Sequence, residues 1–160
     1  ATVNTSEIYL GGLTFFDKPD KVRKMYREPL SIEENVQIAQ DGSKGDIWRY
    51  GDSVEIVFYD KSIASITVSS NNGWTTPSGL AVGMKLDDAI KRYGKPDSPR
   101  SFNDKGVDVY YYTGTHIPDA SIWIVCDKTS HKILKLCVRN YGIPNIGEYN
   151  LDGMIKWLLK

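Results

Sequence analysis

Apolar residues recur at every second position in parts of this chain, as at Val54, Ile56 and Phe58, and this period predicts half-buried β-strands. Neighbouring strands are separated by short turns such as Gly51-Asp52, which is typical of a two-residue hairpin. Each half of the chain therefore predicts a three-stranded antiparallel meander. The six expected strands are residues 46–50, 53–59, 63–69, 107–113, 120–126 and 133–139.

A helical pattern precedes each group of strands. In the first half, Pro19 stands at the first helical position, where its missing N–H costs no hydrogen bond, and Pro29 marks the end. In the second half, Asp87 and Asp88 place negative charge at the positive end of a helix, and a Gly-Lys-Pro stop follows at residues 94–96. We interpret the two aspartates as helix-start charges rather than as catalytic carboxylates.

The two halves also match in sequence when the chain is shifted against itself by 67 positions, which aligns Tyr26 with Tyr93 and Pro29 with Pro96. The pattern predicts an α+β fold made by tandem duplication, in which each unit is a helical segment plus a three-stranded antiparallel meander. We expect the units to pack as one body with the helices on one sheet face. The predicted parts are a first repeat at 7–70, a linker at 71–78, a second repeat at 79–141 and a tail at 142–160.

The tail has the spacing of an amphipathic helix. Its apolar residues recur at intervals of three and four, and Asn150 is a suitable N-cap. We expect this helix to pack on the body; the alternative is a helix that binds a partner. The apolar positions are Leu151, Met154, Ile155, Leu158 and Leu159.

The composition of the chain excludes several classes of function. The 160 residues contain 20 Lys+Arg and 20 Asp+Glu, and this balance argues against a nucleic-acid binder and against a polybasic membrane-surface protein. No apolar run approaches the roughly 20 residues of a membrane span. The chain begins at Ala1 without a signal region, which fits a secreted protein after signal removal or a cloned fragment.

The two cysteines, Cys126 and Cys137, are too few for a disulfide scaffold. If Cys126 lies opposite Ile133, the cysteines stand roughly 13 Å apart along neighbouring strands. A disulfide needs Cα atoms within about 7 Å, so we predict two free thiols. Two cysteines and two histidines without paired spacing are also a poor zinc ligand set, and we expect no metal and no cofactor.

Catalytic motifs are not apparent. His131 lies in a solvated hairpin turn and His116 in a loop, so neither is expected to belong to a pre-organised active site. A dyad of Cys126 and His131 would need a lowered thiol pKa, which nothing in the sequence provides. The chain has no phosphate-binding glycine loop and no Gly-x-Ser-x-Gly motif. We expect a protein that is not an enzyme.

Strand alternation divides the aromatic residues between the two sheet faces. Pairing Tyr50 with Ser53 across a two-residue turn turns Trp48 away from the helices, and the repeat then directs Trp123 and Val125 toward them. Exposed aromatics with polar tips commonly anchor protein partners, so the outer face is the predicted binding site. The alternative is a second core layer, covered by the C-terminal helix or a long loop. The predicted binding residues are Trp48, Tyr50, Tyr59, Tyr110 and Tyr112.

Residues 82–89 read Val-Gly-Met-Lys-Leu-Asp-Asp-Ala, and residues 93–97 read Tyr-Gly-Lys-Pro-Asp. This pattern resembles the SmpA/OmlA (BamE-like) family, in which a Gly-Met-Thr element opens a helix and a Gly-x-Pro closes it before a β-meander. Two such units in tandem resemble the β-lactamase-inhibitor-protein-like fold. The first half departs from the pattern at Phe16-Asp17, and the family's lipid-carrying cysteine is absent. The resemblance implies an extracytoplasmic bacterial location and protein binding rather than catalysis.

The functional expectation is therefore an extracytoplasmic (secreted or periplasmic) bacterial module that binds another protein with an aromatic-rich outer sheet face. An inhibitor of a secreted enzyme, such as a β-lactamase, is one form of it. Two alternatives stay open: a structural or assembly subunit of the cell envelope, and a cell-wall carbohydrate binder that stacks sugars on Trp48 and the tyrosines.

Overall fold

The computed structural model describes residues 1–39, 42–117, 119–140, 155 and 158–160. In the first half, one helix precedes four strands, and each strand is antiparallel to the next. These elements are α1 (Pro19–Tyr26), β2 (Ser31–Gln37), β3 (Lys44–Tyr50), β4 (Val54–Tyr59) and β5 (Ser62–Val68).

The second half has the same order of elements, a helix followed by four antiparallel strands. The N-terminus adds a short strand, β1 (Thr2–Val3), parallel to β7, and a 3-10 helix, η1 (Thr5–Glu7). The elements of the second half are α2 (Leu86–Tyr93), β6 (Arg100–Phe102), β7 (Val107–Gly114), β8 (Ala120–Asp127) and β9 (Ile133–Asn140).

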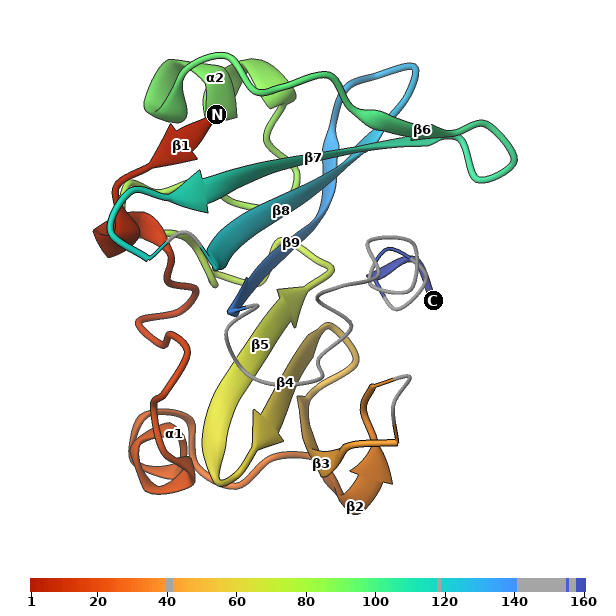
Figure 1. The fold of residues 1–160 in the computed structure, drawn as a ribbon. Coiled ribbons are helices and arrows are strands. Elements are labelled where there is room, and N and C mark those ends of the chain that lie inside the picture. Colours follow the sequence, from red (N-terminus) through yellow and green to blue (C-terminus); the bar gives the residue numbers. More distant parts are fainter. Residues whose placement is uncertain (40–41, 118, 141–154, 156–157) are drawn as a thin grey trace.

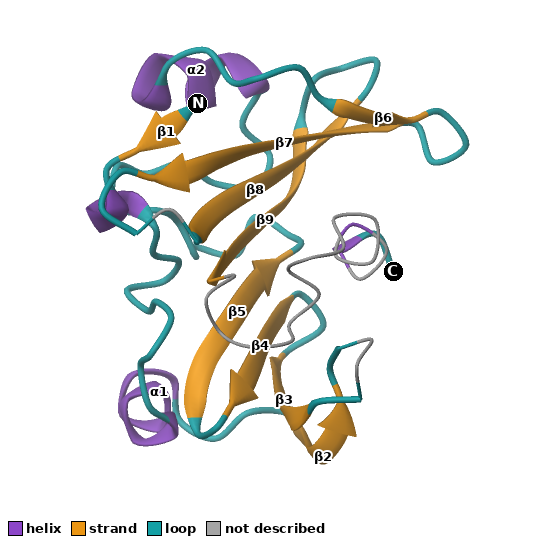
Figure 2. Ribbon diagram, viewed as in Figure 1, coloured by secondary structure: helices purple, strands orange, loops and turns teal. Residues whose placement is uncertain are grey.

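The strands of both halves form one nine-stranded mixed sheet in the order β1-β7-β8-β9-β5-β4-β3-β2, with β6 also paired to β7. The halves meet where β5 runs antiparallel to β9, near the middle of the sheet (Figure 1). Figure 2 shows α1 and α2 at opposite ends of this sheet. The α+β prediction is confirmed as one mixed sheet with two helices.

Both helices begin with the same backbone arrangement. Phe16 (φ +71°) donates its N–H to the carbonyl of Ile63 at 2.9 Å, and Gly83 (φ +95°) donates to Ile133 at 2.9 Å. Each helix start is thereby tied to the last strand of its own half. The predicted helix-start role of the aspartates is confirmed at Asp88, whose carboxylate accepts the backbone N–H of Lys85 at 3.0 Å.

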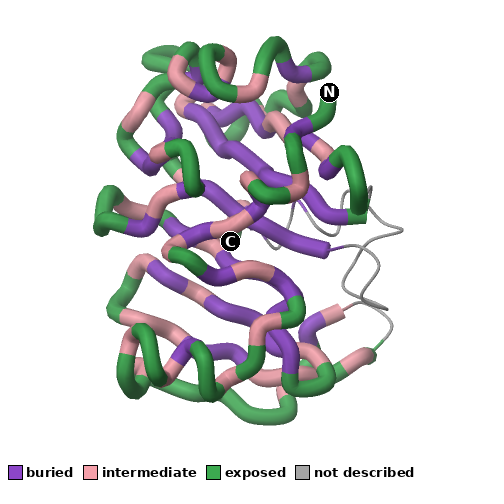
Figure 3. The backbone as a smooth tube through the Cα atoms, turned by 90° about the vertical axis from the view of Figure 1, so that its left-hand side faces the viewer, coloured by how far each residue is buried: buried purple, intermediate pink, exposed green. Residues whose placement is uncertain are grey.

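The sheet separates two hydrophobic cores. The first core lies between the sheet and both helices, with Val22, Leu86 and Ala89 contributed by α1 and α2; we call this side the helix face. The second core lies on the opposite side, the outer face. Figure 3 shows that the central strands are buried along most of their length, whereas turns at both ends are exposed. The second core consists of Val107, Val109, Trp123, Val125, Cys137, Ile155 and Leu158.

Of the predicted tail, only residues 155 and 158–160 lie in the described part of the chain. Ile155 and Leu158 are buried against the outer face, and the N–H of Leu159 donates to the carbonyl of Ile155 at 2.9 Å, as in a helical turn. Residues 141–154, with the predicted cap at Asn150, and residues 156–157 lie outside the described part.

The six predicted strands are confirmed to within a few residues at each end, but each half contributes four strands rather than three. The additional strands are β2 and β6. All residues of β2 except Val36 are exposed, because β2 is the edge of the sheet, so its sequence lacks the apolar period of a half-buried strand. Strand β6 has only three residues, too few to carry any period.

Candidate functional site

The structure places two of the predicted binding aromatics of the first half, Trp48 and Tyr50, on the helix face. Trp48 is 4% exposed and belongs to the first core, while Tyr50 and Tyr59 pack against that core. The turn between β3 and β4 spans three residues, so Tyr50 pairs with Val54 rather than with Ser53. A shift of one residue exchanges the two faces of a strand, and the predicted exposure of Trp48 and Tyr50 is therefore wrong.

The same inversion affects the second half. Tyr112 is fully buried in the first core, where its hydroxyl donates to the carbonyl of Gly94 at 2.7 Å, and Tyr110 packs against that core. Trp123 and Val125, which were expected on the helix face, belong to the second core instead. The prediction assigned the faces of β8 from those of β4 by the constant offset of 67 residues. The connections between strands differ in length in the two halves, so this offset does not relate equivalent strand positions. The five aromatics therefore do not form an open binding surface.

The prediction of free thiols is confirmed: Cys126 and Cys137 are both free and buried. Cys126 lies opposite Ile133 as expected, but a bulge after Val125 places Cys137 opposite Trp123. The two cysteines consequently lie in different cores, on opposite faces of the sheet. Burial raises the pKa of Cys126 to about 12 and also raises that of Cys137, so neither thiol provides a thiolate at neutral pH.

The two histidines are exposed, as expected. Beside His131, the Asp127 carboxylate accepts the backbone N–H groups of Ser130 at 2.7 Å and Thr129 at 3.0 Å, and these bonds lower the pKa of Asp127. This aspartate stabilises its own turn. Within the described residues, no group of three or more His, Cys, Asp and Glu side chains is arranged to hold a metal ion.

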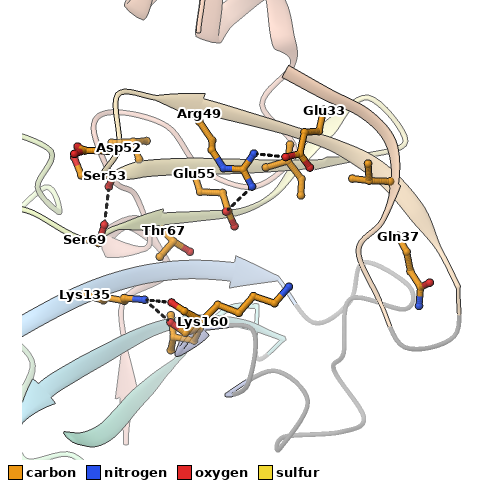
Figure 4. Close-up of a pocket in the computed structure, with 14 residues that line it drawn as sticks. Glu33, Gln37, Arg49, Asp52, Ser53, Glu55, Thr67, Ser69, Lys135 and Lys160 are labelled. Atoms are coloured by element: carbon orange, nitrogen blue, oxygen red, sulfur yellow. Dashed lines mark hydrogen bonds and ion pairs between the residues drawn. The ribbon is translucent and has the colours of Figure 1, made fainter. Parts of the chain in front are cut away.

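The outer face is hollowed beside its covered half. A cleft of about 340 Å³ lies over β2 to β5 and reaches β9 and the described C-terminal residues (Figure 4). Charged and hydroxyl side chains predominate in its lining, together with a few aliphatic ones. Its polar lining includes Glu33, Arg49, Asp52, Glu55, Thr67 and Lys135.

Arg49 occupies the strand wall of the cleft. Its guanidinium donates to the Glu33 carboxylate at 2.8 Å and to the Glu55 carboxylate at 3.4 Å. These contacts connect β3 to β2 on one side and to β4 on the other. The Glu33 side chain is 50% exposed and that of Glu55 is 28% exposed, so the pairs remain accessible to solvent and to a ligand.

Lys135, on β9, lies on the other side of the cleft. Its ammonium group donates to the carbonyl of Leu158 at 2.9 Å and to that of Lys160 at 3.3 Å. Burial lowers the pKa of Lys135, and the nearby Glu55 carboxylate opposes that change. This lysine ties the C-terminal residues to the rim of the cleft, as a cation near the end of a helix commonly does.

One cross-strand row links the cleft to the second core. Successive direct partners run from β3 through β4, β5, β9 and β8 to β7, and the row changes from polar to apolar between β5 and β9. At its apolar end, the rings of Trp123 and Tyr111 stack at 4.6 Å. The row is Arg49, Glu55, Thr67, Cys137, Trp123 and Tyr111.

Sequence reasoning missed the cleft. The available signal was the opposite charges at Glu33, Arg49 and Glu55, on three successive strands. Such charges are ordinary on a solvated sheet face. Only the register shows that they are neighbours beside a cavity.

No helix in the described part of the chain has both the length and the apolar character needed to cross a membrane.

No model of a known protein family matches the chain, and no curated protein matches it. Its fold is similar to solved bacterial structures. One is an extracellular protein containing an SCP domain from Bacillus anthracis, with 11% identity and a TM-score of 0.53 over 88% of this chain and 46% of the other. Another is a cysteine-rich secretory protein from Staphylococcus aureus, with 14% identity and a TM-score of 0.54 over 86% of this chain and 48% of the other.

At these identities the similarity shows the fold alone, and this chain spans about half the length of either solved protein. The finding overturns the resemblance to the SmpA/OmlA family and to the β-lactamase-inhibitor-protein-like fold. The quoted residues of the second half are start and stop signals of a helix before strands, and unrelated α+β proteins can share such signals.

Proposed function

We propose that this chain is an extracytoplasmic bacterial module that binds another protein through the cleft on its outer sheet face. The observation that carries the proposal is the uneven cover of that face. Ile155 and Leu158 lie over the second core, whereas the part over β2 to β5 is hollow and polar. Charged and hydrogen-bonding side chains from neighbouring strands offer a partner both shape and charge complementarity.

The proposed location is supported by the proteins that share the fold. One is described as extracellular and another as secretory, and both are bacterial. Because this chain shares the fold over about half of their length, we propose the same location for it.

We favour binding over catalysis because the groups with nucleophilic potential are poorly placed for reaction. Cys126 and Cys137 are buried with raised pKa values, on opposite sides of the sheet. In the cleft, Arg49 is occupied by two carboxylates and Lys135 by two carbonyls. Such groups serve recognition well.

A protein partner is better supported than a cell-wall glycan. Sugar-binding sites commonly stack rings on aromatic side chains, and among the residues that the structure describes none of those lining the cleft is aromatic. Inhibition of a secreted enzyme and assembly of an envelope complex are both forms of protein binding, and the cleft is compatible with each.

The proposal extends to the origin of the fold by internal duplication. In support, Arg27 and Gly94, which are 67 residues apart, both follow a helix at positive φ, and each donates its N–H to a carbonyl four residues earlier. The hydroxyl of Tyr50 donates to Arg27 as that of Tyr112 donates to Gly94. Together with the matching helix starts, these contacts favour two related units within one sheet.

The binding proposal can be tested by site-directed photo-crosslinking in an extract of the producing organism. A photoreactive amino acid at Ser69, on the rim of the cleft, should yield a discrete protein adduct. The matched control carries the same amino acid at Lys91, an exposed residue of α2 on the opposite side of the molecule. Equal adducts from both positions, or adducts from Lys91 alone, would contradict the proposal.

A further inference from the structure

The charges around the cleft are segregated. Glu33, Asp52, Glu55 and Arg49 belong to β2, β3, β4 and the turn between β3 and β4, and these side chains carry a formal charge of −2. The side chains of Lys135 and Lys160 carry +2 on the other side (Figure 4). The cleft is therefore neutral as a whole but strongly dipolar across its width.

This dipole is held in place by the fold. Arg49 bridges two carboxylates, at 2.8 Å to Glu33 and 3.4 Å to Glu55, so the acidic wall keeps its geometry without a ligand. Lys135 is fixed on the basic wall by its bonds to two carbonyls. Charges that are already oriented need little rearrangement when a partner binds, which reduces the entropic cost of association.

We propose that the cleft binds a zwitterionic polypeptide segment, with a basic side chain toward Glu33 and Asp52 and an acidic side chain toward Lys135 and Lys160. This inference rests on the proposed protein-binding function and adds the chemistry of the partner. A segment with charges of one sign gains from one wall and is repelled by the other, so the dipole selects against it.

The remainder of the lining suits a peptide backbone. Thr67, Ser69 and Gln37 donate to partners within the chain, which leaves their side-chain oxygens to accept peptide N–H groups, and Ser53 keeps a hydroxyl proton to donate. The volume of about 340 Å³ is near the lower end of the range of small-ligand pockets, roughly 300–1,000 Å³. It accommodates a few residues of a longer chain.

The test uses short peptides with blocked termini, which carry charge only on their side chains. A series with one Lys and one Asp, separated by one, two or three alanines, is titrated against the isotope-labelled protein. We expect at least one spacing to shift the amide signals of Glu55, Thr67 and Ser69. We also expect it to bind about tenfold more tightly than peptides with Lys replaced by Gln or Asp by Asn.

Two variants check each wall separately. Glu33→Gln and Lys160→Gln change exposed side chains outside both cores, and each is expected to weaken the zwitterionic peptide about 5- to 10-fold. The matched control Lys91→Gln removes a charge from the helix side and should leave binding unchanged. Equal binding of singly charged peptides, or equal weakening by Lys91→Gln, would overturn the inference.

The two proposals can fail separately. If crosslinking from Ser69 captures a partner but no zwitterionic peptide perturbs the cleft amides, the protein-binding function stands and the inferred ligand chemistry is wrong. If peptides bind in the cleft but crosslinking occurs equally at Lys91, the charge selectivity stands and the proposed binding face is wrong.

Discussion

Some residues in this protein adopt backbone conformations that their residue types do not favour, and these conformations strain the chain. Arg27 ends α1 at φ +68° and ψ −158°, a combination that is essentially restricted to glycine. Gly94 ends α2 at φ +87° and ψ +179°, where no strain arises. The two helix ends therefore adopt nearly the same conformation at different energetic cost.

This difference makes a stability prediction. Arg27→Gly should raise the free energy of unfolding by about 1 kcal/mol, because relief of strain exceeds the greater entropy of glycine in the unfolded chain. Gly94→Ala should lower it by about 1–3 kcal/mol through strain alone, since no atom lies within 4 Å of the added methyl group. Urea denaturation measures both. The same sign for the two changes would contradict this explanation.

The burial of Trp48 makes a second prediction. Trp48 packs on Phe58 at 4.8 Å, with the Arg23 guanidinium 4.4 Å from its ring centre, so Trp48→Ala should cost about 3–5 kcal/mol of stability. Tyr112→Phe, which removes only the hydroxyl bond to Gly94, should cost about 1 kcal/mol. Calorimetric melting checks both values. An unchanged melting temperature for Trp48→Ala would indicate that Trp48 is exposed rather than buried.

At the scale of the element, the two halves of the sheet are protected from other chains in different ways. The edge strand β2 exposes Glu33 and Glu34 and is interrupted by a bulge in which Asn35 has φ +53°. Charge and irregularity of this kind hinder pairing with other chains, and they leave Glu33 available to the cleft. On the outer face of β7–β9, protection comes instead from Ile155 and Leu158.

The C-terminal cover can be followed with the two cysteines. Leu158→Ala should loosen the cover and raise the alkylation rate of Cys137, beneath it, by at least about tenfold, while Cys126 on the helix face stays protected. Mass spectrometry of the labelled peptides separates the two sites. Leu134→Ala, at an exposed position of β9, is the matched control and should change neither rate. Equal acceleration at both cysteines would indicate global unfolding rather than local opening.

At the scale of the whole molecule, several titratable groups are buried in their protonated forms. Burial raises the pKa of Cys126 and of Tyr112 to about 12, from 9.0 and 10.0 respectively, and it also raises that of Cys137. In the unfolded chain these protons are released at lower pH. The folded state then binds more protons than the unfolded state, so stability falls as pH rises from about 9 to about 12.

The measurement is a set of denaturation midpoints from pH 7.5 to 10.5. One such group contributes at most about 1.4 kcal/mol per pH unit, and Cys126→Ala should reduce the slope in this window although it lowers stability at neutral pH. Val138→Ala, a truncation in the same core without a titratable group, should lower stability and keep the slope. A slope unchanged by Cys126→Ala would contradict the assignment.

Features of this fold that depend on a few neighbouring residues were predictable, whereas features that depend on pairing between distant segments were not. The start of α1 at Pro19, the helix-start role of Asp88 and the strand cores were predictable because proline geometry, backbone capping and apolar period act within a few residues. The faces of Trp48 and Tyr112 were not. One additional turn residue, Ser53, changes the pairing of β3 with β4, so the side chains of β3 lie on the face opposite to the predicted one.

The sequence by itself determined the class of the fold, the approximate positions of both helices and the six interior strands, and the free state of the two thiols. Tertiary structure alone decided which face is covered, where the halves join at β5 and β9, and that Glu33, Arg49, Glu55 and Lys135 surround one cleft. The reason is physical: propensity and capping are short-range effects. A binding cleft instead depends on strand pairing between distant segments. The alternative pairing registers of two strands differ by a shift of a single residue, which local sequence does not resolve.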